Sequence, residues 1–133
     1  MIARSAGPHH DCSAFIQACA LPGAVYMTKV AREDAKSHFA FQTQLEVLDF
    51  IAHGGLQEPV FDNSTPLSKG PAQDIGRLVD AYTFSYGKKT VYLAFYLNFK
   101  NIWIVKSFHP PRLGERGVAL SHYPFASLKE HKK

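Results

Sequence analysis

The chain has 133 residues, of which 46% are hydrophobic and 13% aromatic, so it suits a single folded domain and general disorder is excluded. No apolar run reaches the roughly 18 residues of a membrane span, and the amino terminus lacks the basic and apolar regions of a secretory signal. These features predict a soluble, cytoplasmic protein with no membrane partner.

The charges are unevenly divided along the chain. Residues 1–80 contain six basic and nine acidic side chains, a net of −3, whereas residues 81–133 contain nine basic and two acidic side chains, a net of +7. The overall charge of +4 therefore conceals a strongly basic second half. Such an imbalance indicates an anionic partner for that half.

The first predicted element is a short helix over residues 11–20, ended by Leu21, Pro22 and Gly23. We expect residues 1–26 to form an amino-terminal extension and residues 27–133 to form a single α+β domain. The two cysteines are seven residues apart, about two helical turns, which is too far for a disulfide. Their spacing with His9 and His10 matches no standard zinc pattern, and no cofactor motif is found, so the sequence predicts no cofactor.

The middle of the chain predicts one clear helix, residues 44–53, which Thr43 caps and Gly54 and Gly55 end. Upstream, residues 32–36 fit either an exposed helical turn or a loop. Residues 56–71 contain three prolines and an Asp-Asn-Ser-Thr cluster, so we expect an irregular segment there. Residues 71–77 are predicted to form a short helix with proline in its first turn.

Three consecutive strands follow, over residues 78–87, 90–96 and 102–108, because apolar residues alternate with polar or aromatic ones between two tight turns. Residues 117–123 are predicted to form a fourth strand. Helices therefore precede an antiparallel meander, and the predicted class is α+β, with helices packed on one face of a small antiparallel sheet. The opposite face is expected to be partly free for a partner.

The succession of strand, glycine-containing turn, strand, turn and strand resembles the RelE/ParE/HigB superfamily of small bacterial toxins. The three strands and their turns carry the resemblance, together with the preceding helix and the approach Pro66-Leu67-Ser68-Lys69-Gly70. It extends over about residues 44–123. The resemblance implies a RelE-like fold and a cytoplasmic toxin that acts on ribosome-bound messenger RNA and is neutralised by a cognate antitoxin protein. The sequence leaves the oligomeric state open.

The ribonuclease members of that superfamily cleave without a metal, by attack of the ribose 2′-hydroxyl, and this chemistry requires cations and an acid near the scissile phosphate. By resemblance, Lys106 and Arg112 would hold the phosphate, His122 would be the acid beside Tyr123, and His109 is the alternative acid. The candidate catalytic residues are thus Lys106, His122, Tyr123 and His109, and the candidate RNA-binding residues are Lys88, Lys89, Lys100, Arg112 and Arg116.

One departure favours an alternative. Catalytic members usually carry an arginine on the second strand, and residues 91–96 contain none. The same scaffold would then serve a non-enzymatic binding protein, such as a ParE-like gyrase inhibitor or an immunity or accessory protein. Structural interpretations also exist for the candidate residues: Lys88 and Lys89 suit a solvated turn, Lys106 an edge strand, and His109 the end of a strand.

Overall fold

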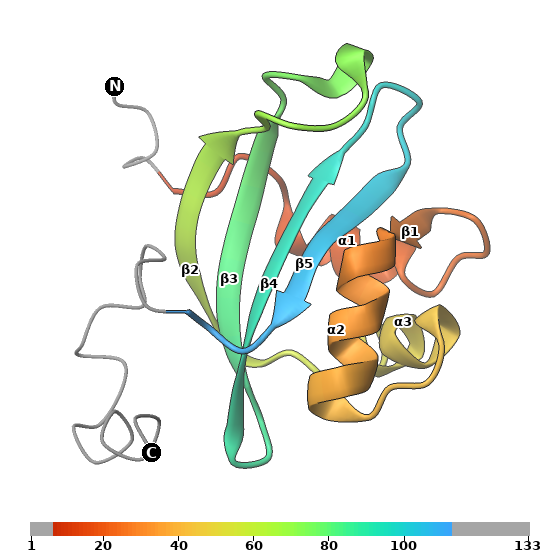
Figure 1. Cartoon of the computed structure of the whole chain (residues 1–133), viewed down its shortest axis with the longest axis vertical. Helices are drawn as coiled ribbons and strands as arrows, with labels where there is room; N and C mark the ends of the chain where they lie inside the picture. The colour runs from red at the N-terminus through yellow and green to blue at the C-terminus, as the bar shows by residue number, and fades with distance from the viewer. Residues whose placement is uncertain (1–6, 113–133) are drawn as a thin grey trace.

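The computed structural model describes residues 7–112, and within them three helices and a five-stranded sheet form an α+β fold (Figure 1). The strands lie in the order β1-β5-β4-β3-β2. Their bounds are Val25–Met27 for β1, Gln57–Pro66 for β2, Leu78–Tyr86 for β3, Lys89–Leu97 for β4 and Trp103–His109 for β5. The three predicted strands are confirmed as β3, β4 and β5, whereas the predicted fourth strand, residues 117–123, lies outside the described residues.

The sheet is mixed, which corrects the prediction of a purely antiparallel sheet. Strands β2 to β5 pair antiparallel, but β1 pairs parallel with β5 through Val25 and Trp103, Tyr26 and Ile104, and Met27 and Val105. A parallel pair needs a long crossover connection, which here runs through the helices and the rest of the sheet. Strand β1 has three residues and pairs with residues 78 positions further along the chain, so no local pattern in the sequence predicts it.

Strand β2 contradicts the prediction that residues 56–71 are irregular. Within residues 7–112 it is an edge strand that pairs only with β3, and its register shifts twice, between Gln57 and Val60 and between Phe61 and Asn63. Six of its ten residues are exposed, so it lacks the alternation of a half-buried strand. Prolines are tolerated on such an edge, where no ladder donor is required.

The helices are α1, Cys12–Ala18; α2, Lys29–Phe39; and α3, Gln44–Ala52. The predicted helices over 11–20 and 44–53 are confirmed as α1 and α3, and the undecided residues 32–36 belong to α2. The side chain of Thr28 caps α2 by accepting from the Ala31 amide, as that of Thr43 caps α3 by accepting from the Glu46 amide. The short helix predicted over 71–77 is a single 3₁₀ turn, Ala72–Asp74.

The main core lies between the helices and one face of the sheet, and Phe95 on β4 occupies its centre. Phe95 is fully buried, and its ring stacks on Phe15 of α1 with centroids 3.9 Å apart and on Tyr82 of β3 at 5.9 Å. A smaller cluster on the opposite face comprises Leu67, Val79, Ala81, Ala94 and Tyr96. The face without helices is thus partly covered by the chain's own apolar side chains.

Residues 9–27 are integrated into this architecture. The fully buried carboxylate of Asp80 accepts the backbone amides of His9, at 3.1 Å, and His10, at 2.7 Å, and Phe15 belongs to the main core. The expectation that residues 1–26 form an extension separate from a 27–133 domain stays a prediction. Among the described residues, no helix has the length and apolarity needed to cross a membrane.

Candidate nucleic-acid interface

Lys106 is the extra residue of a β-bulge on β5. Phe95 of β4 pairs with Val105 and Ala94 pairs with Ser107, so Lys106 lies between two paired residues without a partner position on β4. It is exposed, while Val105 before it is buried. Bulges are frequent beside active sites because they redirect a side chain out of the regular ladder. The bulge therefore gives Lys106 a specific, solvent-facing position on an otherwise apolar strand.

The amino terminus of α2 lies against this bulge. Thr28, the capping residue, donates its amide to the Val105 carbonyl at 3.0 Å, and its hydroxyl donates to the Lys106 carbonyl at 3.5 Å. The first turn of α2 contains no acidic residue and begins with the exposed Lys29. Because a helix amino terminus carries a partial positive charge, the ammonium groups and the helix terminus together favour an anion here.

Arg32 and Tyr26 lie beside the same terminus. The Arg32 guanidinium donates to the Met27 carbonyl at 2.7 Å and lies over the Tyr26 ring, 5.4 Å from its centroid. Tyr26 is 49% exposed on β1, opposite Ile104 of β5. The corner where β5 meets α2 thus contains Lys29, Arg32 and Lys106, and the Arg32 guanidinium lies over the exposed Tyr26 ring. We call these three cations and Tyr26 the α2/β5 corner. Its one described ion pair joins Lys29 to Glu33 at 4.0 Å, and both side chains are largely exposed.

The other predicted cations do not gather at this corner. Lys88 and Lys89 lie at the β3–β4 turn, at the opposite end of β4 from Lys100 in the β4–β5 turn (Figure 1). The Lys89 ammonium donates to the His38 carbonyl at 2.7 Å, a favourable position at the carboxyl end of α2. Arg112 lies 3.8 Å from the Asp34 carboxylate. The structure therefore distributes the predicted cations over several surfaces instead of one.

The candidate acids are not assembled around Lys106 within the described residues. His109 is 3% exposed; its ring stacks on Tyr92 at 5.3 Å, and its Nδ1 lies 2.7 Å from the Pro110 carbonyl, to which it donates. His109 therefore packs into the sheet instead of facing solvent beside Lys106. His122, Tyr123 and Arg116 lie outside the described residues.

A groove of about 680 Å³ opens at the β1 edge, and sequence reasoning did not predict it. The loop before β1, β1 itself, the start of α3 and the β4–β5 turn form its walls. Its lining includes Tyr26, Leu45, Phe99, Lys100 and Ile104. Several of these apolar side chains are exposed, among them Leu45 at 66% and Phe99 at 41%. The one signal of this groove in the sequence was the aromatic Phe99 within a polar turn.

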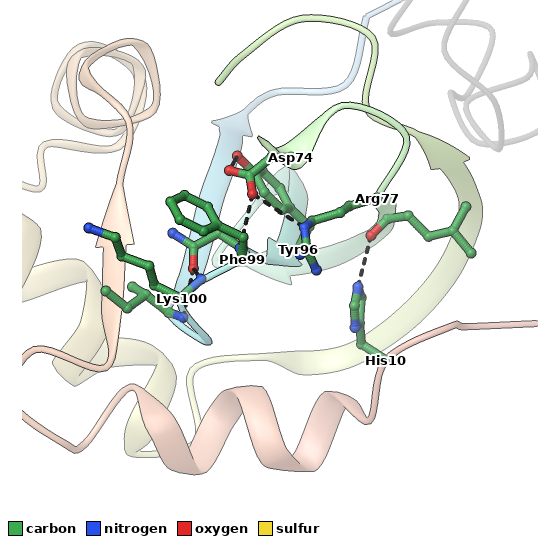
Figure 2. Close-up of polar contacts among 9 residues, drawn as sticks. His10, Asp74, Arg77, Tyr96, Phe99 and Lys100 are labelled. Carbon is green, nitrogen blue, oxygen red and sulfur yellow. Dashed lines mark hydrogen bonds and ion pairs between the residues drawn. The ribbon is translucent and has the colours of Figure 1, made fainter. Parts of the chain in front are cut away.

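A buried carboxylate fixes the turn that supplies Phe99 and Lys100. Asp74 is 1% exposed; its carboxylate accepts the Phe99 amide at 2.9 Å and the Tyr96 hydroxyl at 3.4 Å and pairs with Arg77 at 3.3 Å. Figure 2 shows Phe99 and Lys100 on one side of Asp74 and Arg77 on the other. Asn98 also accepts the amides of Lys100 and Ile102 within the turn. Burial, reinforced by the Asp74 carboxylate, raises the pKa of Tyr96, so its hydroxyl stays protonated and donates.

The two thiols do not form a reactive centre. Cys12 and Cys19 are free, as their spacing predicts. Burial raises the pKa of Cys12 and raises that of Cys19 to about 12, which disfavours the nucleophilic thiolate. Among residues 7–112, no three His, Cys, Asp or Glu side chains gather in a way that would hold a metal ion.

Comparison of the chain with protein-family models, with curated proteins and with solved structures finds no match.

Proposed function

We propose that this protein binds RNA, free or on the ribosome, through the α2/β5 corner. The observation that carries the proposal is the exposed Lys106, set on a β-bulge directly against the amino terminus of α2. The Lys106 side chain reaches solvent, where its ammonium group can pair with an anionic partner.

Two features of the corner support a phosphate-bearing ligand over an apolar one. The first turn of α2 contains no acidic residue that would neutralise the helix dipole. Lys29 and Arg32 add two further cations, and Arg32 is held in place by the Met27 carbonyl. Phosphate contacts from such groups provide affinity without sequence specificity.

Cleavage is the part of the proposal that depends on the RelE-like resemblance. In this reading Lys106 would stabilise the charge on the scissile phosphate, and His122 with Tyr123 would supply the acid. His109 is a poor candidate for the acid because it is packed against Tyr92. The cognate antitoxin would then cover the α2/β5 corner.

A non-enzymatic binding protein is the second candidate. It is favoured by the burial of His109 and by the absence of an arginine from β4, Lys89–Leu97. Such a protein would occupy its target through the same cations without cutting it.

RNA binding is tested by fluorescence anisotropy with a labelled single-stranded RNA between about 50 and 200 mM salt. We expect the wild type to bind and Lys106→Ala to weaken binding. The slope of log affinity against log salt should become shallower by about 1, the change expected for the loss of one phosphate contact. Lys69→Ala is the control and should change binding little, since Lys69 is exposed and follows β2 at the other edge of the sheet. No binding by the wild type at the lowest salt, or equal binding by Lys106→Ala, refutes the proposal.

Cleavage is tested separately by primer extension on ribosome-bound messenger after expression of the protein. New 5′ ends that disappear in His122→Ala support the ribonuclease. Growth arrest without new 5′ ends supports the non-enzymatic binder.

A further inference from the structure

We propose that the groove at the β1 edge takes a segment of single-stranded RNA whose bases stack on Tyr26 and Phe99. This inference rests on the proposed function, since it assigns the part of the ligand that lies beyond the phosphate contacts of the α2/β5 corner. It names two residues that the candidate RNA-binding set did not contain.

Tyr26 has the position and exposure of a stacking residue. It is 49% exposed and lies between the cations of the α2/β5 corner and the groove that it lines. The Arg32 guanidinium, 5.4 Å from the ring centroid, is fixed by its hydrogen bond to the Met27 carbonyl. A tyrosine ring with an arginine beside it offers both stacking and cation–π contact to a base.

Phe99 repeats this arrangement on the β4–β5 turn. Its ring is 41% exposed, and the Lys100 ammonium lies 5.6 Å from the ring centroid. The backbone that carries Phe99 is fixed, because its amide is bound by the buried Asp74 and the next amide by Asn98 (Figure 2). Since the turn is already ordered, little backbone entropy is lost when a base stacks on the exposed ring.

Both aromatic rings and Lys100 line one groove, and Arg32 lies beside it at the Tyr26 ring. The volume of about 680 Å³ falls within the roughly 300–1,000 Å³ typical of small-molecule sites. Ile104 and Leu45 add apolar surface between the rings, and the charged side chains of the lining are Lys100 and Asp49. Among the described lining residues these two charges balance, and the Arg32 guanidinium adds a cation beside the groove, at the Tyr26 ring.

The hydrogen bonds already made at the β1 edge favour RNA over an added peptide strand. The outer backbone of β1 is partly occupied, because the Met27 amide donates to Gln44 and the Met27 carbonyl accepts from Arg32. A peptide that extended the sheet would have to displace both contacts. Bases on aromatic rings and phosphates on cations need neither displacement, which is the arrangement of sequence-tolerant single-strand binding.

The inference is tested with four variants in the anisotropy assay. Tyr26→Ala and Phe99→Ala should each weaken binding roughly tenfold, whereas Tyr26→Phe should remain within about twofold of the wild type. Val60→Ala is the matched control, since Val60 is 52% exposed on β2 at the other edge of the sheet. Circular dichroism checks that each variant is folded, as expected for exposed positions.

Crosslinking gives a second readout that does not depend on the variants. RNA containing 4-thiouridine is irradiated in the wild-type complex, and the adducts are mapped by mass spectrometry. Adducts on the peptides that contain Tyr26 or Phe99 support the inference, and adducts confined to other peptides overturn it.

The two proposals fail in different ways. If the wild type binds RNA and Lys106→Ala weakens it, but Tyr26→Ala and Phe99→Ala bind like the wild type, the groove assignment is wrong and the proposed function stands. If the wild type binds no RNA, both are wrong, and the groove serves a different kind of partner.

Discussion

Replacing Asp80 by alanine should destabilise the fold strongly, because its side chain binds residues about 70 positions away in the sequence. The carboxylate is fully buried and accepts the His9 and His10 amides at 3.1 and 2.7 Å. Hydrogen bonds to charged groups contribute about 1.5–3 kcal/mol each, so the two together contribute about 3–6 kcal/mol. Relief of the buried charge offsets part of this, and water can reach the exposed His9, so we expect the free energy of unfolding to fall by about 2–4 kcal/mol.

Urea unfolding followed by Trp103 fluorescence provides the measurement. Trp103 is the only tryptophan, and its ring lies edge-on to His10 at 5.4 Å, so its emission reports on the same region. Asp80→Asn leaves one acceptor for two amides and should lose about half as much stability. Hydrogen exchange at the His9 and His10 amides should accelerate in both variants.

Asp11→Ala is the matched control. Asp11 is an exposed aspartate that accepts the nearby Ser13 amide as the cap of α1, and such caps contribute only about 1 kcal/mol. If Asp80→Ala costs no more than Asp11→Ala, the long-range contacts do not stabilise the fold and the reasoning is refuted.

Two further predictions concern the core. Phe95→Ala should lower the free energy of unfolding by about 3–5 kcal/mol in urea, because it removes the ring between Phe15 and Tyr82, whereas Phe99→Ala, at an exposed ring, should change it by less than about 0.5 kcal/mol. Equal losses would contradict the assignment of Phe95 to the centre. For Cys19, burial raises the pKa from 9.0 to about 12, so the thiol contributes stability that is complete below pH 9.0 and is lost as the pH rises toward 12. The free energy of unfolding, measured from about pH 8 to 11, should fall as the pH rises, and it should fall less steeply in Cys19→Ala. An equally steep fall in that variant would contradict this prediction.

Local sequence patterns predicted the elements that depend on residues close together in the sequence. The helix α3 has its cap at Thr43 and its turn glycines in the sequence, and the meander β3–β4–β5 follows from period-2 alternation between tight turns. The α+β class follows from their order. The spacing of Cys12 and Cys19 was likewise enough to exclude a disulfide, because a helix fixes the distance between residues seven apart.

Tertiary contacts alone decided the rest. Strands β1 and β2 are the edges of the described sheet. Strand β1 has only three residues, too few for its alternation to be recognised, and β2 is mostly exposed and does not alternate. The same holds at the candidate interface: the basic residues of the second half were visible in the sequence, but strand direction sends Lys88 and Lys100 to opposite ends of the sheet. Only the folding of α2 against β5 brings Lys29, Arg32 and Tyr26 to the bulged Lys106, since backbone contacts between Thr28 and β5 join residues nearly 80 positions apart.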